Sequence, residues 1–105
     1  MIVHYYYLKP DISKWNTNNI EDMKFSFCGC SSLLSLPDLS EWKTDNVTNM
    51  SNLFYGCLSL ISLPFIYKWN ISNVSCICYC FSECISLISI PNIFKDKLKF
   101  KDCYK

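Results

Sequence analysis

The apolar residues of this chain recur every 27 residues, and this spacing is the strongest signal in the sequence. Three copies, residues 10–36, 37–63 and 64–90, align without a gap. The same point in each copy, and the start of a decaying fourth, is marked by a proline: Pro10, Pro37, Pro64 and Pro91. Self-similarity at a period between about 20 and 50 residues is typical of stacked repeat architectures. The period therefore predicts a solenoid.

Seven columns of this alignment are apolar in every copy. They comprise Trp15, Trp42 and Trp69, then Phe27, Phe54 and Phe81, and five columns that begin at Ile12, Ile20, Met23, Leu33 and Leu36. One copy cannot bury these side chains alone, whereas stacked copies place each residue over its equivalent and build a continuous core. A further column, Cys30, Cys57 and Cys84, repeats with the apolar ones. Because unpaired Cys is among the most buried residue types, we interpret this column as a structural ladder rather than a redox or metal site.

Within a copy, the local patterns predict two short strands and a short helix. Residues 60–66 are apolar around a proline, which suits a strand that runs into a corner. Residues 46–50 alternate polar and apolar positions, which favours a second strand. Residues 51–57 favour one or two helical turns, with Ser51 as the N-cap and Gly56 near the end.

One departure between copies bears on that helical end. The third copy has Glu83 where the second has Gly56. We therefore expect that a left-handed residue is not required there in every copy. A single repeat domain is predicted over residues 1–94, followed by a basic C-terminal tail or cap over residues 95–105.

The second copy carries a specific motif. It reads Trp42-Lys43-Thr44-Asp45-Asn46-Val47-Thr48-Asn49-Met50-Ser51-Asn52-Leu53-Phe54-Tyr55-Gly56-Cys57. This stretch resembles the BspA-like class of leucine-rich repeats, and the resemblance covers roughly residues 10–94. It implies a leucine-rich-repeat-like α/β solenoid of short parallel strands with short helical turns, three full repeats and partial ends. It also implies surface proteins that adhere to host proteins or other cells, without catalytic residues.

Composition gives mixed indications of location. Eight cysteines and four Asn-x-Ser/Thr sequons suggest an oxidising, extracellular setting. The first ten residues lack the features of a signal peptide, and no apolar run approaches the ~18 residues of a spanning helix. The expected location is the cell surface if the chain is part of a longer array, and the cytoplasm if it is complete. The net charge of +1 gives no case for nucleic acid, and no membrane insertion is expected.

A cluster of thiols in the third copy is not demanded by the repeat. Its members are Cys76, Cys78, Cys80 and Cys84. Thiolates bind zinc, but the spacing does not match the two separated Cys pairs of common zinc fingers. We expect no metal, and the alternative is a disulfide within the cluster or to Cys28 or Cys103.

No catalytic set is visible in the sequence. A nucleophile–base pair would depend on His4, the single histidine. The two glycines, Gly29 and Gly56, form no phosphate-binding loop. We therefore expect no enzymatic activity and no cofactor.

Two columns change character along the repeats. Aspartate becomes Phe65 in one, and serine becomes Tyr67 and then Phe94 in the other. If the early copies expose these columns, the three aromatic residues form a surface apolar patch of the kind that marks a contact site. The alternative is that both columns face inward.

The leading interpretation is a non-enzymatic protein-interaction module, part of a surface or adhesion protein with leucine-rich repeats. Its expected partner is a protein of unknown identity, or neighbouring repeats of a longer chain. One alternative is an intracellular repeat scaffold. Another is a small cysteine-rich protein that binds a metal or reacts through thiols.

Overall fold

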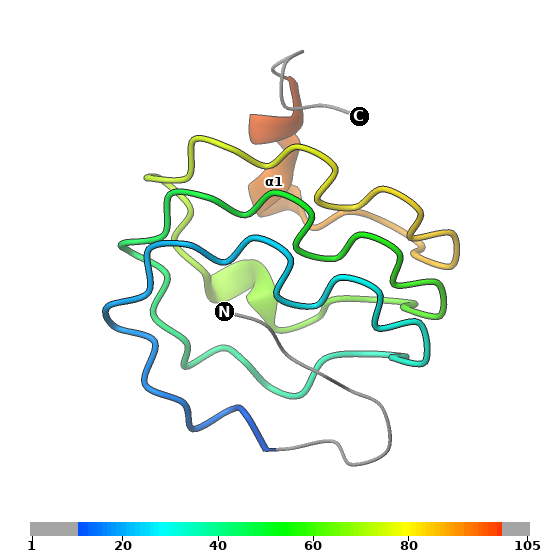
Figure 1. Ribbon diagram of the computed structural model, residues 1–105, viewed down its shortest axis with the longest axis horizontal. Helices are drawn as coiled ribbons and strands as arrows, with labels where there is room; N and C mark the ends of the chain where they lie inside the picture. The colour runs from blue at the N-terminus through cyan, green and yellow to red at the C-terminus, as the bar shows by residue number, and fades with distance from the viewer. Residues whose placement is uncertain (1–10, 100–105) are drawn as a thin grey trace.

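The computed structural model describes residues 11–99, in which three successive coils of chain lie stacked on one another (Figure 1). Regular structure is sparse along this part of the chain. It consists of the 3-10 helix η1 (Ile66–Lys68), the α-helix α1 (Asn92–Lys95) and the 3-10 helix η2 (Lys97–Lys99). The three coils correspond to the three 27-residue copies, and α1 and η2 follow the last of them.

The predicted solenoid of parallel strands with short helical turns is wrong. Within residues 11–99 the structure contains no β-strand, and pairing is limited to two isolated parallel bridges, Asp22 with Asn49 and Asn49 with Cys76. Residues 46–50 and 60–66 do not form the expected strands, and residues 51–57 form turns rather than a helix.

Consecutive turns replace the strands because N–H groups alternate between bonds within a coil and bonds to the next coil. Within the first coil, Ser26 and Cys28 donate to the carbonyls of Met23 and Phe25, at 3.2 and 3.1 Å, and so close local turns. The N–H groups between them donate to carbonyls of the second coil: Met23 to Asn49 (2.8 Å), Phe25 to Ser51 (3.1 Å), Phe27 to Leu53 (2.9 Å) and Gly29 to Tyr55 (2.7 Å). Because local turns use every second N–H group, the bonds between coils do not continue into a regular β-ladder.

These turns require a left-handed backbone at two positions of each coil. The first position is occupied by Phe25, Asn52 and Tyr79, with φ of 62°, 56° and 60°. The second is occupied by Gly29, Gly56 and Glu83, with φ of 74°, 73° and 63°. The expectation drawn from Glu83 is therefore wrong, because this residue adopts the same left-handed conformation as the two glycines.

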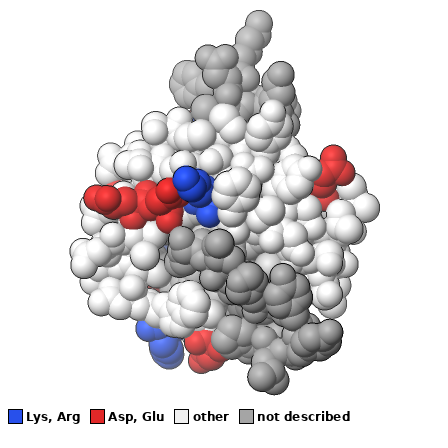
Figure 2. Space-filling view, in the orientation of Figure 1, with Lys and Arg blue, Asp and Glu red and all other residues white. Residues whose placement is uncertain are grey.

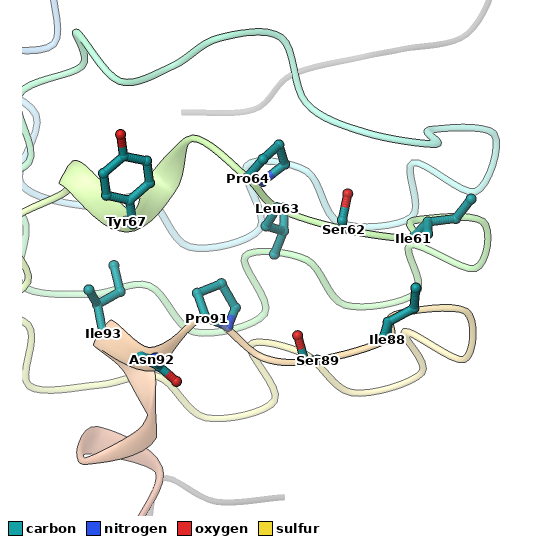
Figure 3. A pocket seen from close by; sticks show the side chains of 10 residues that line it. All are labelled: Ile61, Ser62, Leu63, Pro64, Tyr67, Ile88, Ser89, Pro91, Asn92 and Ile93. Atoms are coloured by element: carbon teal, nitrogen blue, oxygen red, sulfur yellow. The ribbon is translucent and has the colours of Figure 1, made fainter.

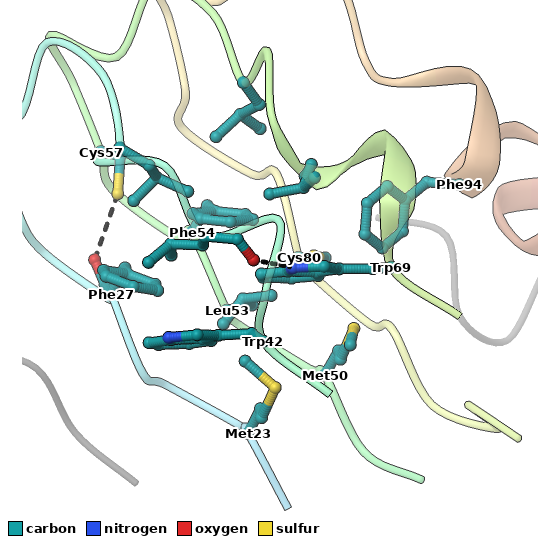
Figure 4. Packing of buried hydrophobic residues seen from close by; sticks show 14 of the residues in the cluster. Met23, Phe27, Trp42, Met50, Leu53, Phe54, Cys57, Trp69, Cys80 and Phe94 are labelled. Carbon is teal, nitrogen blue, oxygen red and sulfur yellow. Dashed lines mark hydrogen bonds between the residues drawn. The ribbon is translucent and has the colours of Figure 1, made fainter. Parts of the chain in front are cut away.

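The apolar columns form the core, as the period predicted. In the second coil all seven members are buried: Leu39, Trp42, Val47, Met50, Phe54, Leu60 and Leu63. Equivalent rings lie face to face between coils (Figure 4). The Trp42 ring is 6.4 Å from Trp15 and 6.1 Å from Trp69, and the Phe54 ring is 5.6 Å from Phe27. Trp15, in the first coil, is 43% exposed.

The chain after the third coil folds back over the end of the core. Phe94 in α1 is fully buried, with its ring centroid 5.2 Å from that of Phe81 in an edge-on arrangement. The Lys97 ammonium donates to the carbonyl of Val74 at 2.7 Å. The predicted boundary between residues 94 and 95 falls inside α1, and the tail beyond residue 99 lies outside the described residues. No helix within residues 11–99 is long and apolar enough to cross a membrane.

Candidate functional site

Polar side chains fasten each coil to its neighbour. The indole N–H of Trp42 donates to the carbonyl of Ile12 at 2.9 Å, and that of Trp69 donates to the carbonyl of Leu39 at 3.0 Å. Both of these tryptophans are buried. Stacking and hydrogen bonding together account for the tryptophan column as a structural ladder that supports the surface around it.

The column of Cys30, Cys57 and Cys84 also lies between coils. The Cys57 thiol donates to the carbonyl of Phe27 at 3.1 Å (Figure 4). The Cys84 thiol donates to the carbonyl of Phe54 at 3.0 Å. Burial, and secondarily the neighbouring thiols of Cys84 and Cys30, raises the pKa of Cys57 to about 12. Because the thiolate is the reactive form, Cys57 is a poor nucleophile at neutral pH.

The predicted thiol cluster divides into separate parts. The sulfurs of Cys76 and Cys78 lie 3.7 Å apart on partly exposed side chains. Cys80 is buried, and burial raises its pKa, while the Cys84 thiol is engaged with the carbonyl of Phe54. Over residues 11–99 no three metal-ligating side chains gather, and the cysteines there form no disulfide with one another. Cys103 lies outside the described residues.

The predicted aromatic patch does not form as a set of three. Phe65 and Tyr67 are exposed, at 37% and 61%, but Phe94 is fully buried against Phe81. The exposure of Tyr67 does not carry over to Phe94, its equivalent in the alignment, because the chain leaves the repeated path after Pro91 and enters α1. Phe94 is therefore a core residue that closes the end of the stack.

Tyr67 instead lines a groove between the last two coils, which we call the corner groove. Its volume is about 380 Å³. Figure 3 shows the two runs of chain that form its sides, residues 61–67 and 88–93. The lining residues are Ile61, Ser62, Leu63, Pro64, Tyr67, Ile88, Ser89, Pro91, Asn92 and Ile93. None of these side chains is charged, so the corner groove suits an uncharged and largely apolar occupant.

A stripe of exposed aliphatic residues leads into the corner groove. Leu34, Ile61 and Ile88 occupy one column and are 57%, 44% and 80% exposed. Their backbones are fixed, because the N–H of Ile61 donates to the carbonyl of Leu34 at 3.0 Å and that of Ile88 donates to Ile61 at 3.1 Å. Burying apolar surface is favourable by about 25 cal/mol per Å², so this stripe is a ready contact surface.

Sequence reasoning missed this stripe, although a signal for it exists. Each copy has two adjacent aliphatic residues at this point: Leu33-Leu34, Leu60-Ile61 and Leu87-Ile88. The first of each pair joins the core, so the second points away from it. Figure 2 shows that, among the described residues on the face turned to the viewer, most are uncharged and the charged ones gather in a few places.

Two of the four sequon asparagines, Asn46 and Asn73, donate side-chain hydrogen bonds between coils. The side-chain amide of Asn46 donates to the carbonyl of Asn18 at 2.8 Å, and that of Asn73 donates to Asp45 at 2.7 Å. A glycan attached to either amide nitrogen would interfere with these bonds between coils.

These features define a stack of coils that several polar side chains join and whose surface carries an apolar stripe and groove. The chain belongs to the family described as "Mycoplasma protein of unknown function, DUF285", which matches residues 1–101. No curated protein and no solved structure matches the chain.

Proposed function

We propose that this chain is a non-enzymatic protein-interaction module, which binds an uncharged apolar segment of another protein at the corner groove. The observation that carries the proposal is the exposure of Ile88, at 80%, beside a groove with no charged lining residue. Exposed apolar patches on soluble proteins commonly mark contact sites. Charged lining groups would have to lose water on binding, and their absence from this groove favours an apolar partner.

The fixed backbone around the corner groove supports binding rather than catalysis. The backbone of the groove is held by the bonds between Leu34, Ile61 and Ile88, and its lining residue Leu63 belongs to the packed core, against which Ile93 packs. A fixed surface binds with little loss of conformational entropy, so even a modest contact area yields measurable affinity.

Placement at the cell surface is the finer part of the proposal. The repeated Asn-Val-Thr-Asn-Met and Gly-Cys elements resemble BspA-like surface repeats, and that resemblance supports an adhesive role. Limited proteolysis of intact cells that produce the protein tests this placement. Cleavage before lysis is expected, and full protection until lysis would contradict surface placement.

Binding can be tested on the full chain by NMR titration. The probe is a capped hexapeptide of alternating Leu and Ser, and the comparison peptide has Lys in place of Leu. We expect the Leu peptide to shift amide signals of residues 61–67 and 88–93, and the Lys peptide to shift none.

The matched variants are Ile88→Ser and Ile85→Ser. Both isoleucines are highly exposed, at 80% and 76%, but only Ile88 lines the corner groove. Serine is tolerated in the column of Ile85, because Ser31 occupies it in the first coil. Ile88→Ser should weaken peptide binding at least threefold, whereas Ile85→Ser should leave it unchanged. Equal effects of the two variants, or no shifts at any peptide concentration, would refute the proposal.

A further inference from the structure

The thiols of Cys76 and Cys78 occupy a position where the fold brings two side chains together. In the second coil the equivalent residues are Asn49 and Ser51. The Asn49 carboxamide oxygen accepts bonds from the Ser51 N–H at 2.9 Å and from its hydroxyl at 2.6 Å. In the third coil the same geometry sets the two sulfurs 3.7 Å apart. Their proximity is therefore built into the repeat.

The backbone on both sides of this pair is anchored to the second coil. Cys76 forms the parallel bridge with Asn49, and its carbonyl accepts a bond from Met50 at 2.8 Å. The carbonyl of Cys78 accepts a bond from Asn52 at 2.9 Å. A disulfide has an S–S distance of about 2.05 Å, so the sulfurs must approach by about 1.7 Å. We expect rotation of the side chains about χ1 to supply that approach without breaking the backbone bonds to the second coil.

The surroundings distinguish this pair from two fully buried cysteines, Cys57 and Cys80. Cys76 and Cys78 are partly exposed, whereas Cys57 and Cys80 are buried at 0% and 1% exposure. Burial raises the pKa of both buried thiols and leaves little thiolate at neutral pH. An external reagent therefore meets the Cys76–Cys78 pair before it meets the core thiols.

We propose that Cys76 and Cys78 form a dithiol site that reacts with low-molecular-weight disulfides by thiol–disulfide exchange. One cysteine thiolate attacks a sulfur of the external disulfide, whose S–S bond breaks and releases one thiolate. The second cysteine thiolate then attacks the mixed disulfide, forms the Cys76–Cys78 bond and releases the second thiolate. The two released thiolates take up the two protons that the cysteines lost and become thiols. The cysteine pair is oxidised by two electrons, and the external disulfide is reduced to two thiols.

The test uses the reduced full-length chain and glutathione disulfide as the probe, with acid quenching and intact mass measurement. Oxidation of the pair lowers the mass by about two units, with no glutathione retained. Peptide mapping without reduction should place both cysteines in one internally bridged peptide. Accumulation of a stable glutathione adduct on the unmodified chain, or no reaction, would overturn the proposal.

Two kinds of variant control the experiment. The double variant Cys76→Asn/Cys78→Ser restores the residue pair of the second coil, so it should fold normally and lose the two-unit mass decrease. Cys78→Ser alone removes the second thiol, so a glutathione adduct should persist on Cys76.

Cys103 needs separate treatment, because it lies 27 residues after Cys76 in sequence. In Cys103→Ser the Cys76–Cys78 bridge should form as in the unmodified chain. A bridge that maps to Cys103 or Cys28 instead would refute the proposed pairing. The proposed peptide binding at the corner groove does not depend on this outcome, since neither thiol lines that groove.

Discussion

Glu83 occupies a left-handed position that its two equivalents fill with glycine, and replacing it should stabilise the protein. Its φ is 63°, against 74° and 73° for Gly29 and Gly56. A non-glycine residue in this region costs roughly 1–2 kcal/mol. Glycine brings an opposing cost of roughly 0.5–1 kcal/mol, because its unfolded chain has more conformational freedom. The strain relief is the larger contribution, so Glu83→Gly should raise the free energy of unfolding by about 0.5–1 kcal/mol.

Thermal unfolding measured by circular dichroism is a sufficient assay. For a domain of this size, the expected gain corresponds to a rise in Tm of about 4 °C. Glu83 is exposed, so little packing is lost. Glu41→Gly is the matched control, because Glu41 is also exposed but does not have a left-handed backbone. That change should lower the Tm, since glycine's entropic cost acts there without any relief of strain.

The reciprocal change separates backbone strain from crowding. A Cβ at Gly56 would lie 3.7 Å from the Cα of Gly29, which is ordinary contact, and a Cβ at Gly29 would meet nothing within 4 Å. Gly56→Ala and Gly29→Ala should therefore cost about the same, roughly 1 kcal/mol each. An unchanged or lower Tm for Glu83→Gly would refute the assignment of strain to this column.

Three further predictions concern the core. Trp69→Phe removes the indole donor to Leu39 and should cost about 1–3 kcal/mol in urea unfolding, whereas Trp15→Phe, at a 43% exposed position, should cost less than 1 kcal/mol. Phe94→Ala should cost about 3–5 kcal/mol because the side chain is fully buried; a loss below 1 kcal/mol would place it at the surface after all. The raised pKa of Cys57 implies stability that is fully present below pH 9 and declines towards pH 12, because the unfolded thiol ionises first. Urea titrations should show a steeper loss over that range in the unmodified chain than in Cys57→Ala, by up to about 1.4 kcal/mol per pH unit.

The core was predictable from sequence because stacking places equivalent residues over one another. The period alone identified columns such as Trp42 over Trp15, and a repeated apolar column has no other efficient means of burial. The hydrogen bond from the Trp69 indole to Leu39 was not predictable in the same way, because it depends on the offset between neighbouring coils.

The strands were predicted wrongly because residue patterns do not reveal competition between hydrogen bonds. Alternation at residues 46–50 suits a strand, but local turns take alternate N–H groups in the run that follows. Phe25 and Tyr79 carry left-handed backbones without the glycine that usually indicates one. Phe94 shows a related limit. Alignment with earlier copies predicts the burial of a residue only while the chain follows the repeated path, which ends at Pro91.

The turn-rich run of each coil also has a direction. Its N–H groups at residues 23, 25, 27 and 29 all donate to the second coil, and those at residues 50, 52, 54 and 56 all donate to the third. Along this run the stack is therefore polar, with carbonyls directed out of the first coil and amide hydrogens directed out of the third. A segment that joins the third coil along this run must offer acceptors, and one that joins the first coil must offer donors. Extra coils can therefore be appended in one orientation only, so growth by whole repeats preserves the order in which they are added.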